Sequence, residues 1–561
     1  MASTNTRERE YIEMFNELES DREAWEGLWE DVTRYVLPER DLWESYDTHP
    51  EADVKKGEEI FDSKAVSALQ TLANGLIGYN VGPTITWFKL RLLHDELNDI
   101  PGVKDWLEQC EKVIYSVFHR SNFYDSVNEY YQDLGSIGTA TMIVEENIGA
   151  FNINYDARHP KETYLVESAS DRIDSVYRQF WLSGRNALRR YGTETMPETL
   201  VKDMENEPTN RWRFIHIVHP REDRVIYSDL PQDKPILSVE MYYDDETILF
   251  ESGYDDMPIL TSRWRKNSNE IYGRSPSMSA LSAIKRVNQH KLHMMQAGQL
   301  AVQPILQGPK EMLRRLKREP FAFNQYKDPQ RRLFTLDTSN GYPFGRDILD
   351  QIYEEIDDHF LTDLFLMLQR SERQMTAREI VERQGEKVAG LAGPLTRQNH
   401  EFLGPVVKRT FNISMQAGWL PPPPEVLLKT GIPLDVDFTG LLAQAQKRYH
   451  QANSINAGLS VIGGIIKEFD PSARHKIDFH DLVEKIAEAE GFPQSSLRED
   501  QEVEELVAQE KEQQQQAQQS AMMEQQGKAN SGLAKAPEVG SPAESIMNQI
   551  TQSAQTVNKG G

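Results

Sequence analysis

The sequence has almost no cysteine, since Cys110 is the only one among 561 residues. A single thiol excludes an intramolecular disulfide and any metal site built from several cysteines, and it suits a reducing cytoplasm. No activating residue pattern surrounds Cys110. We therefore interpret it as a small apolar residue of the core.

Long hydrophobic runs are also missing. No stretch approaches the roughly 18 apolar residues that a membrane-spanning helix needs. Residues 1–15 are charged and lack the apolar segment of a secretory signal. We therefore expect neither a membrane span nor secretion. Hydrophobic residues still make up 39% of the chain, which is enough for folded cores and excludes wholesale disorder.

Positive charge is in short supply. The chain has 62 lysines and arginines against 88 aspartates and glutamates, which gives a formal net charge of −26. This balance argues against a protein that wraps nucleic acid through a broad basic face, because Lys and Arg supply most phosphate contacts. It does not exclude a protein that lets DNA pass without gripping it.

Motifs of known chemistry are absent. The sequence contains no P-loop and no G-x-G-x-x-G, H-E-x-x-H or G-x-S-x-G pattern. His290 and His293 have a spacing that can bind a metal, but no carboxylate or cysteine partner lies near them in the sequence. Ser282–Lys285 fits S-x-x-K without the companion motifs of that signature. We therefore interpret these histidines and this segment as ordinary positions on a long helix, without a metal-binding or catalytic role.

Adjacent carboxylates occur at Glu354-Glu355 and Asp357-Asp358. Neighbouring positions of a helix face different ways, so these residues favour a solvated acidic face over an acid/base pair. We therefore predict no catalytic residue, no metal site and no cofactor, and we favour a structural protein. A Mg²⁺-dependent nucleic-acid-processing enzyme without a recognisable motif is the alternative, because 88 carboxylates can cluster by chance.

Hydrophobic periodicity predicts helices in the first quarter of the chain and strands in the second. The expected helices cover 7–36, 62–79 and 101–134, and the first is interpreted as a helix that docks on its own domain. A mostly antiparallel β region follows over 138–265, with a helical insert near 184–191. Its expected strands are 138–144, 164–167, 173–181, 213–219, 238–243 and 247–250.

Two long helices are predicted beyond this region. The first covers 275–301, with Ser275 as N-cap and Pro276 at the first helical position, and spans roughly 37 Å. The second covers 347–368. A third helical stretch begins at Thr376 and is interrupted at Gly393-Pro394 and Gly404-Pro405, so we expect a kink there. Helices at 440–470 and 478–512 precede a Gln-rich tail, 513–561, that is expected to be disordered.

A basic segment separates the two long helices. Residues 308–332 contain eight basic and three acidic residues, a local balance of +5 in an acidic chain. The flanking helices place it at the tip of a hairpin. Such a tip suits docking to an acidic partner or to a phosphate backbone, and an ordinary solvated tip is the alternative.

The order of several short motifs resembles the portal, or head-to-tail connector, proteins of short-tailed, podovirus-type bacteriophages. The resemblance covers about residues 7–510. Ser275 stands where the family pattern has glycine. The motifs are 61–65 (FDSKA) with 72–76 (LANGL) and Trp87-Phe88, 133–141 (DLGSIGTAT), Arg263-Trp264 with 272–276 (YGRSP), 375–379 (MTARE) with 403–405 (LGP), and 442–446 (LAQAQ).

The resemblance implies an α+β, mostly α protomer of a twelve-membered ring. The implied parts are a wing (1–274, helical over 1–134 and β-rich over 138–265), a two-helix stem (275–301 and 347–368), a small α/β clip (302–346), a tunnel loop (369–375), a kinked tunnel helix that completes the wing (376–435), a helical crown (436–512) and the tail (513–561). The ring would form the channel at one capsid vertex through which double-stranded DNA is packaged and later ejected.

The resemblance also implies partners and sites. The expected partners are a terminase motor, a tail adaptor, and the major capsid and scaffolding proteins, in the virion and, during assembly, in the host cytoplasm. On the tunnel loop, Arg370, Arg373 and Gln374 are candidates for contact with passing DNA, although pairing with Glu372 and Glu379 could instead hold the loop. Candidates for clip docking are Lys310, Arg314, Arg315, Lys317, Arg318, Arg331 and Arg332. Another internal virion protein is a further alternative.

Overall fold

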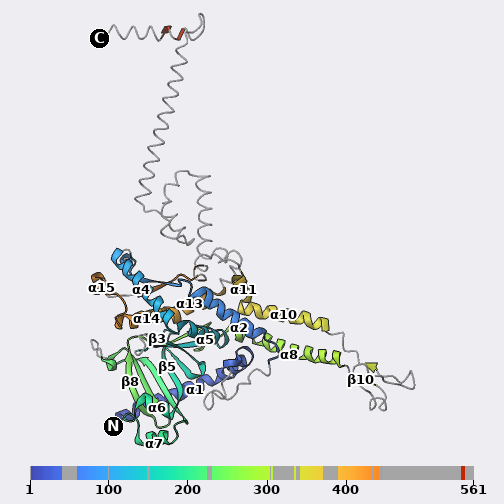
Figure 1. Ribbon diagram of the computed structural model, residues 1–561, viewed down its shortest axis with the longest axis horizontal. Helices are drawn as coiled ribbons and strands as arrows, with labels where there is room; N and C mark the ends of the chain where they lie inside the picture. Colours follow the sequence, from blue (N-terminus) through green and yellow to red (C-terminus); the bar gives the residue numbers. More distant parts are fainter. Residues whose placement is uncertain are drawn as a thin grey trace, which may run out of the picture. The chain divides into compact units, whose positions relative to one another are not determined.

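The computed structural model describes residues 2–40, 60–98, 100–147, 152–223, 230–303, 305–307, 334–335, 342–370, 390–430 and 434–440, together with 442, 444, 545–546 and 548–549. The chain divides into two compact units, Met1–Ala457 and Gly458–Gly561. The elements below belong to the first unit (Figure 1). The predicted helices at 440–470 and 478–512 and the tail lie almost wholly outside the described residues.

The predicted N-terminal helices are confirmed. α1 spans Ala2–Val36, and α2, Lys64–Leu76, continues as a π-helical turn η2, Ile77–Val81. The stretch predicted at 101–134 forms two helices, α4 (Pro101–Arg120) and α5 (Phe123–Ser136). Shorter helical pieces are η1 (Pro38–Arg40), α3 (Asp95–Asn98), η4 (Pro160–Glu162), η5 (Pro231–Asp233) and α15 (Glu425–Thr430).

α1 docks on its own unit, as predicted. Near its start, the buried Phe15 packs edge-on against Tyr164 with ring centroids 4.7 Å apart. About two turns further on, the buried Arg22 stacks over the same tyrosine ring and donates to the carbonyl oxygen of Lys161 at 2.9 Å. The C-terminal part of α1 contributes Val32 to the main core. This helix therefore joins the β region to the helical body.

The predicted antiparallel β region is confirmed, and it contains two sheets. A three-stranded sheet has the order β3-β2-β9, and a five-stranded sheet has the order β4-β5-β6-β7-β8. The strands are β2 (Thr139–Asn147), β3 (Asn152–Arg158), β4 (Thr163–Glu167), β5 (Ile173–Ser183), β6 (Arg211–Pro220), β7 (Ile236–Tyr242), β8 (Thr247–Tyr254) and β9 (Ile259–Arg263). The helical insert is α6, Gly184–Tyr191, and sequence patterning missed the neighbouring α7, Glu198–Asn206.

The two long helices predicted beyond the sheets are present with different limits. α8 spans Pro276–Val302, and α10 spans Tyr342–Phe360. Between them, β10 (Leu306–Gln307) pairs with β11 (Phe334–Thr335). The prediction of one continuous helix over 347–368 is wrong, because the helix stops at Leu361 and α11, Thr362–Arg370, begins anew. Figure 1 shows α8 and α10 extending side by side away from the sheets.

The interruption expected at Gly404-Pro405 is a π-helical turn. α13 (Ala392–Gln398) runs into η7 (Asn399–Leu403), which runs into α14 (Gly404–Gln416). Pro405 lacks the N–H of a regular helix, and a π-turn is one way in which a helix absorbs such a loss. After α15, β12 (Leu434–Phe438) pairs with β1 (Phe88–Leu92), so the chain returns to its first strand.

The main core gathers residues from the helices and the three-stranded sheet. Cys110 is fully buried in it, as predicted, and burial raises the pKa of its thiol to about 12. Smaller apolar clusters lie on the two sides of the five-stranded sheet. Among the helices that the structure describes, none combines the length and the hydrophobicity that a membrane-spanning segment requires.

Asp133, at the end of α5, is a buried carboxylate in this core. Burial raises its pKa from 3.8 to about 7, and the Arg40 guanidinium, 3.3 Å away, only partly opposes this shift. Because the folded pKa is the higher one, Asp133 favours the folded state below about pH 4. This contribution is lost as the pH rises through 7.

We predict that Asp133→Asn becomes more stable relative to the parent protein as the pH rises from 5 to 8. The gain should approach about 1.4 kcal/mol per pH unit at most, because the amide has no proton to lose. Urea unfolding at both pH values measures it. Asp105→Asn, at an exposed position of α4, is the control. The prediction would be contradicted if the free energy of unfolding of Asp133→Asn relative to the parent protein were the same at both pH values.

Candidate functional site

The hairpin formed by α8 and α10 is attached to the body where α8 begins. Ser275 caps α8 by accepting from the Met278 amide at 2.9 Å, so serine serves well at the position where the family pattern has glycine. Its hydroxyl also donates to the Ser136 carbonyl oxygen at 2.6 Å, and the Ser277 hydroxyl donates to that of Gly135 at 2.7 Å. The end of α5 and the start of α8 thereby satisfy each other's free polar groups.

Two glycines make this attachment possible. A Cβ on Gly273 would overlap the carbonyl oxygen of Gly138, and Gly138 itself has a φ of 87°. The backbone N–H of Trp264 donates to that same carbonyl oxygen at 2.9 Å. The motif 133–141 and the motif 272–276, far apart in sequence, are therefore two halves of one backbone crossing.

The two hairpin helices pack through an apolar seam with polar contacts at its edges. Ile284 and Val287 of α8 are buried, as are Ile352 and Ile356 of α10. At the edges, Arg286 contacts Glu355 at 2.6 Å, and the His290 ring bonds the Gly345 carbonyl oxygen at 2.9 Å. On the far side of α10, Asp357 contacts Lys64 of α2 at 2.6 Å. Glu354, Glu355 and Asp358 are exposed, as the predicted solvated face requires, and Glu355 and Asp357 also form ion pairs that were not predicted.

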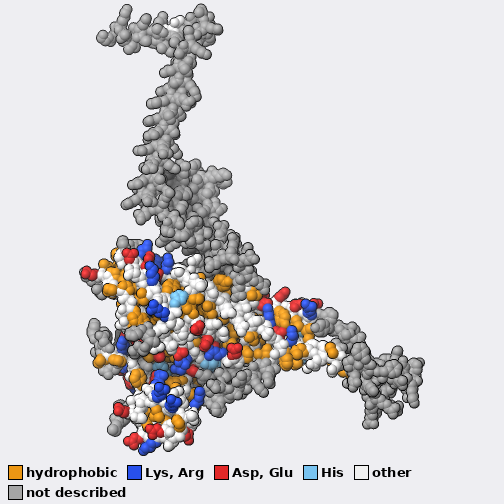
Figure 2. Space-filling model, viewed as in Figure 1, with side chains coloured by type: hydrophobic (Ala, Val, Ile, Leu, Met, Phe, Trp, Pro, Cys, Tyr) orange, Lys and Arg blue, Asp and Glu red, His pale blue; other side chains and the backbone are white. Residues whose placement is uncertain are grey.

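The hairpin helices carry opposite charge. α8 contains no aspartate or glutamate, whereas α10 contains six. Asp347, Asp350 and Glu354 follow each other at steps of three and four residues and are exposed, so they form an acidic stripe on one helix face. None of the three makes an ion pair with a described residue. Figure 2 shows acidic and basic side chains over the paired helices.

The break at Leu361 sets the course of the chain after α10. Leu361 has a φ of 52°, an uncommon conformation for a bulky residue, which ends one helix and starts the next. The buried Phe365 of α11 then packs on Gly75 of α2, where an added Cβ would overlap the phenyl ring. Gly75 belongs to the motif 72–76, so close approach of α2 and α11 accounts for that glycine.

Most predicted site residues lie outside the described part of the chain. Arg370 is the last residue of α11, so at least 369–370 of the expected tunnel loop are helical. Arg373 and Gln374 lie outside the described residues. The same holds for all the clip residues, Lys310, Arg314, Arg315, Lys317, Arg318, Arg331 and Arg332. Their roles stay predictions.

The positions weighed for chemistry are built into the helices. The His290 ring has the carbonyl partner given above, and Lys285 contacts Asp31 of α1 at 2.8 Å. In the portion of the chain that the structure describes, no group of three or more His, Cys, Asp or Glu side chains is placed to hold a metal ion.

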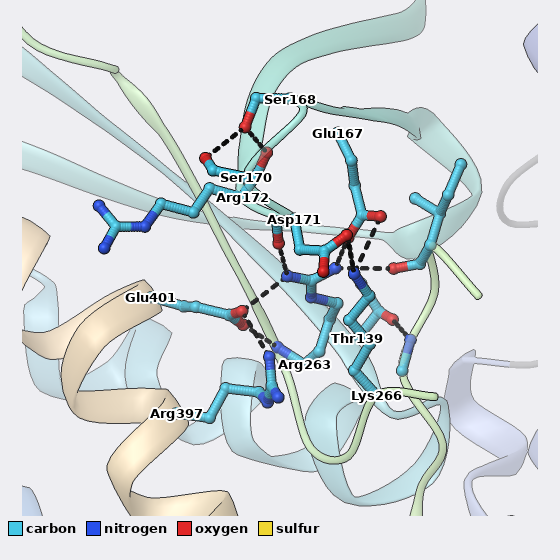
Figure 3. Close-up of polar contacts among 12 residues, drawn as sticks. Thr139, Glu167, Ser168, Ser170, Asp171, Arg172, Arg263, Lys266, Arg397 and Glu401 are labelled. Carbon is cyan, nitrogen blue, oxygen red and sulfur yellow. Dashed lines mark hydrogen bonds and ion pairs between the residues drawn. The ribbon is translucent and has the colours of Figure 1, made fainter. Parts of the chain in front are cut away.

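A buried arginine joins the sheets to the π-helical turn η7 (Figure 3). The Arg263 side chain is fully buried at the end of β9 and donates to Glu167 of β4 and, at 2.7 Å, to Glu401 of η7. It also donates to the carbonyl oxygens of Asp171 at 3.1 Å and Ile271 at 3.2 Å. A buried guanidinium needs such partners, and we call this group the Arg263 cluster.

Two outer cations complete the Arg263 cluster. Lys266 contacts Glu167 at 2.8 Å, and Arg397 of α13 contacts Glu401 at 3.0 Å. Burial of the guanidinium lowers the pKa of Arg263, but hydrogen bonds and charge from the two carboxylates outweigh that effect and raise it overall. Sequence analysis had Arg263 only as part of a family motif and missed Glu167 and Glu401, because no sequence spacing links three segments so far apart.

Comparison with known proteins identifies the family to which the chain belongs. The chain belongs to the bacteriophage head to tail connecting proteins, whose family model matches residues 8–497. The predicted resemblance is therefore confirmed.

Two relatives are portal proteins by name. The probable portal protein of Bordetella phage BPP-1 is 29% identical over 473 residues, covering 82% of this chain and 83% of the relative. The portal protein of Salmonella phage epsilon15 is 28% identical over 513 residues, covering 87% of this chain and 88% of the relative.

We predict that Arg263→Leu lowers the free energy of unfolding by about 3–5 kcal/mol, because two carboxylates lose their buried partner. Arg397→Leu removes a partly exposed partner of the same Glu401 and should cost about 1 kcal/mol or less. Urea unfolding at pH 7 compares the two variants. Equal losses of stability would contradict the prediction that the buried guanidinium of Arg263 contributes more to folding than the partly exposed one of Arg397.

Proposed function

We propose that this protein is the portal of a short-tailed bacteriophage, a structural ring through which double-stranded DNA enters and leaves the capsid. The observation that carries the proposal is the family match over nearly the whole chain together with two portal relatives. We infer a non-catalytic role, a place at the capsid vertex of the virion, and assembly in the host cytoplasm. The motor that packages DNA would be a separate terminase.

We propose an assignment of the portal parts to segments of this chain. The sheets and helices up to residue 274 would form the wing, α8 and α10 the stem, and the β10–β11 pair the base of the clip. The basic residues between β10 and β11 would meet acidic patches on terminase and then on a tail adaptor. α13, η7 and α14 would form the kinked tunnel helix, and residues 436–512 the crown. The capsid and scaffolding proteins would surround the ring.

The ring proposal has a direct test. Twelve copies of the 64.5 kDa chain would form a particle of about 774 kDa with an open centre. Light scattering gives the mass, and electron micrographs viewed along the symmetry axis show the opening. A protein that stays monomeric under all assembly conditions, or a compact assembly without a hole, would contradict the ring.

The acidic stripe of α10 suggests how DNA could slide without sticking. Exposed carboxylates repel phosphates and so keep a duplex away from the wall, whereas cations would bind it. We propose that Asp347, Asp350 and Glu354 face the channel. Arg370, Arg373 and Gln374, further along the chain, would supply short-lived contacts that slow the DNA at one level.

We predict that a triple variant, Asp347→Asn, Asp350→Asn and Glu354→Gln, packages DNA roughly two- to tenfold more slowly, because the wall loses repulsion. The rate should be measured in a packaging reaction with purified motor and proheads at low salt. A matched triple variant on the wing, Glu96→Gln, Asp105→Asn and Glu108→Gln, removes the same charge from exposed positions. Equal packaging rates for the two triple variants would contradict the proposal that the acidic stripe faces the channel.

A further inference from the structure

An arginine-lined pocket opens beside the five-stranded sheet. It has a volume of about 260 Å³, and Arg158, Arg178, Arg190 and Arg211 line it together with Glu162 and Phe180. Figure 2 shows Lys and Arg side chains gathered over α6, which carries Arg190. We call this site the wing pocket. A concentration of guanidinium groups is unexpected in a chain with a net charge of −26.

Two of these arginines are held in place by carboxylates beneath them. Arg178, which is 8% exposed, donates through Nε to Glu162 at 2.7 Å and lies 4.7 Å from the Phe180 ring centre. Arg190 donates to both oxygens of Glu240, at 3.0 Å and 2.5 Å, and lies 5.7 Å from the same ring. These contacts fix both guanidiniums before any ligand arrives, which lowers the entropic cost of binding.

One arginine of the wing pocket has no ion-paired carboxylate among the described residues. Three carboxylates pair with the other arginines, namely Glu162 and Glu240 above and Asp156, which contacts Arg158 at 2.5 Å. Burial lowers the pKa of His216, which lies between Arg178 and Glu240 in the sheet, to about 4, so this histidine is neutral at pH 7. Three of the four guanidiniums therefore have an ion-paired carboxylate, and a further carboxylate, Glu145, acts on Arg190 through its charge without an ion pair.

The arginine without an ion pair among the described residues is Arg211, an exposed residue of the wing pocket lining. Arg211 begins β6, is exposed, and makes no ion pair with any residue that the structure describes. In addition, the buried Nε of Arg158 has no hydrogen-bond partner among the described residues. A buried N–H without a partner is costly, and Arg158 and Arg211 both line the wing pocket, so an anion bound there would be attracted by both side chains.

We propose that the wing pocket receives the carboxylate of an aspartate or glutamate on a partner protein that docks on this lobe. The site is separate from the stem and clip, so it adds a second docking surface to the proposed portal. Its volume suits one acidic side chain. A DNA duplex is a poor occupant. It carries a negative charge about every 1.7 Å along its axis, so its phosphates would be repelled by the exposed carboxylates of α7, which packs on α6. These carboxylates belong to Glu198, Asp203 and Glu205.

A fluorescent hexaglutamate peptide is the probe for this pocket. With the full-length protein at about 50 mM salt, where surface charges are weakly screened, fluorescence anisotropy should show saturable binding. Arg211→Glu should weaken that binding about tenfold or more, and Arg211→Gln should weaken it less. Arg185→Glu makes the same charge change at an exposed position of α6 outside the wing pocket and should leave binding unchanged.

The outcomes separate the occupants. No peptide binding, or equal weakening by Arg211→Glu and Arg185→Glu, would overturn the proposal, because the attraction would then not come from the wing pocket. Two results would overturn the assignment to a protein carboxylate. One is displacement of the peptide by inorganic phosphate at a lower concentration than by free glutamate. The other is a short DNA duplex that binds the parent protein but not Arg211→Glu. Electron micrographs of the same samples report ring formation independently, so failure here and failure of the ring are distinguishable.

Discussion

The fold depends on one close contact between two backbone segments. Gly138 lies between α5 and the first strand of the three-stranded sheet, and Gly273 lies between the last strand of that sheet and α8. Neither position has room for a side chain. The serine hydroxyls of α8 then bind the final carbonyl oxygens of α5. Because the hairpin starts at this crossing, its direction is fixed by the body from which it leaves. Residues that never touch DNA would therefore determine where the channel wall lies.

Charge has different tasks in different parts of the molecule. Inside, the Arg263 cluster ties two sheets to a helix at a place where an unpaired ion would be costly. On the hairpin, the exposed ion pair between Arg286 and Glu355 contributes only about 0–1 kcal/mol to stability. The two helices are held together mainly by the buried apolar side chains of the seam. The acidic stripe matters mainly through the field that it projects into the surrounding water.

Sequence patterning identified the long elements because their periodicity is strong. α1, α8 and the insert α6 were placed within a few residues, and the cap at Ser275 was correct because Ser-Pro is a clear start signal. The break at Leu361 was missed, since a leucine with positive φ leaves no trace in composition. The short strand β12 was missed because it has meaning only when paired with a strand more than 300 positions earlier.

The candidate site divides in the same way. The acidic residues of α10 were visible in the sequence, but the ion pairs of Glu355 and Asp357 were not, because their partners lie on other helices. The four arginines of the wing pocket come from β3, β5, α6 and β6, so no local motif marks them. The expectation of a ring, a clip and a tunnel loop came from family resemblance alone, because a single chain carries no sign of how copies assemble.

The pairing of β1 with β12 has a consequence for synthesis. Residues 88–92 reach the ribosome exit early, yet their partner strand, 434–438, appears only after the sheets, the hairpin and the π-helical segment have been translated. Until then the early strand has an unsatisfied edge, which invites pairing with other chains. A nascent chain cut short before residue 434 would keep that edge open, so premature termination would yield products prone to aggregate rather than shortened subunits that join a ring.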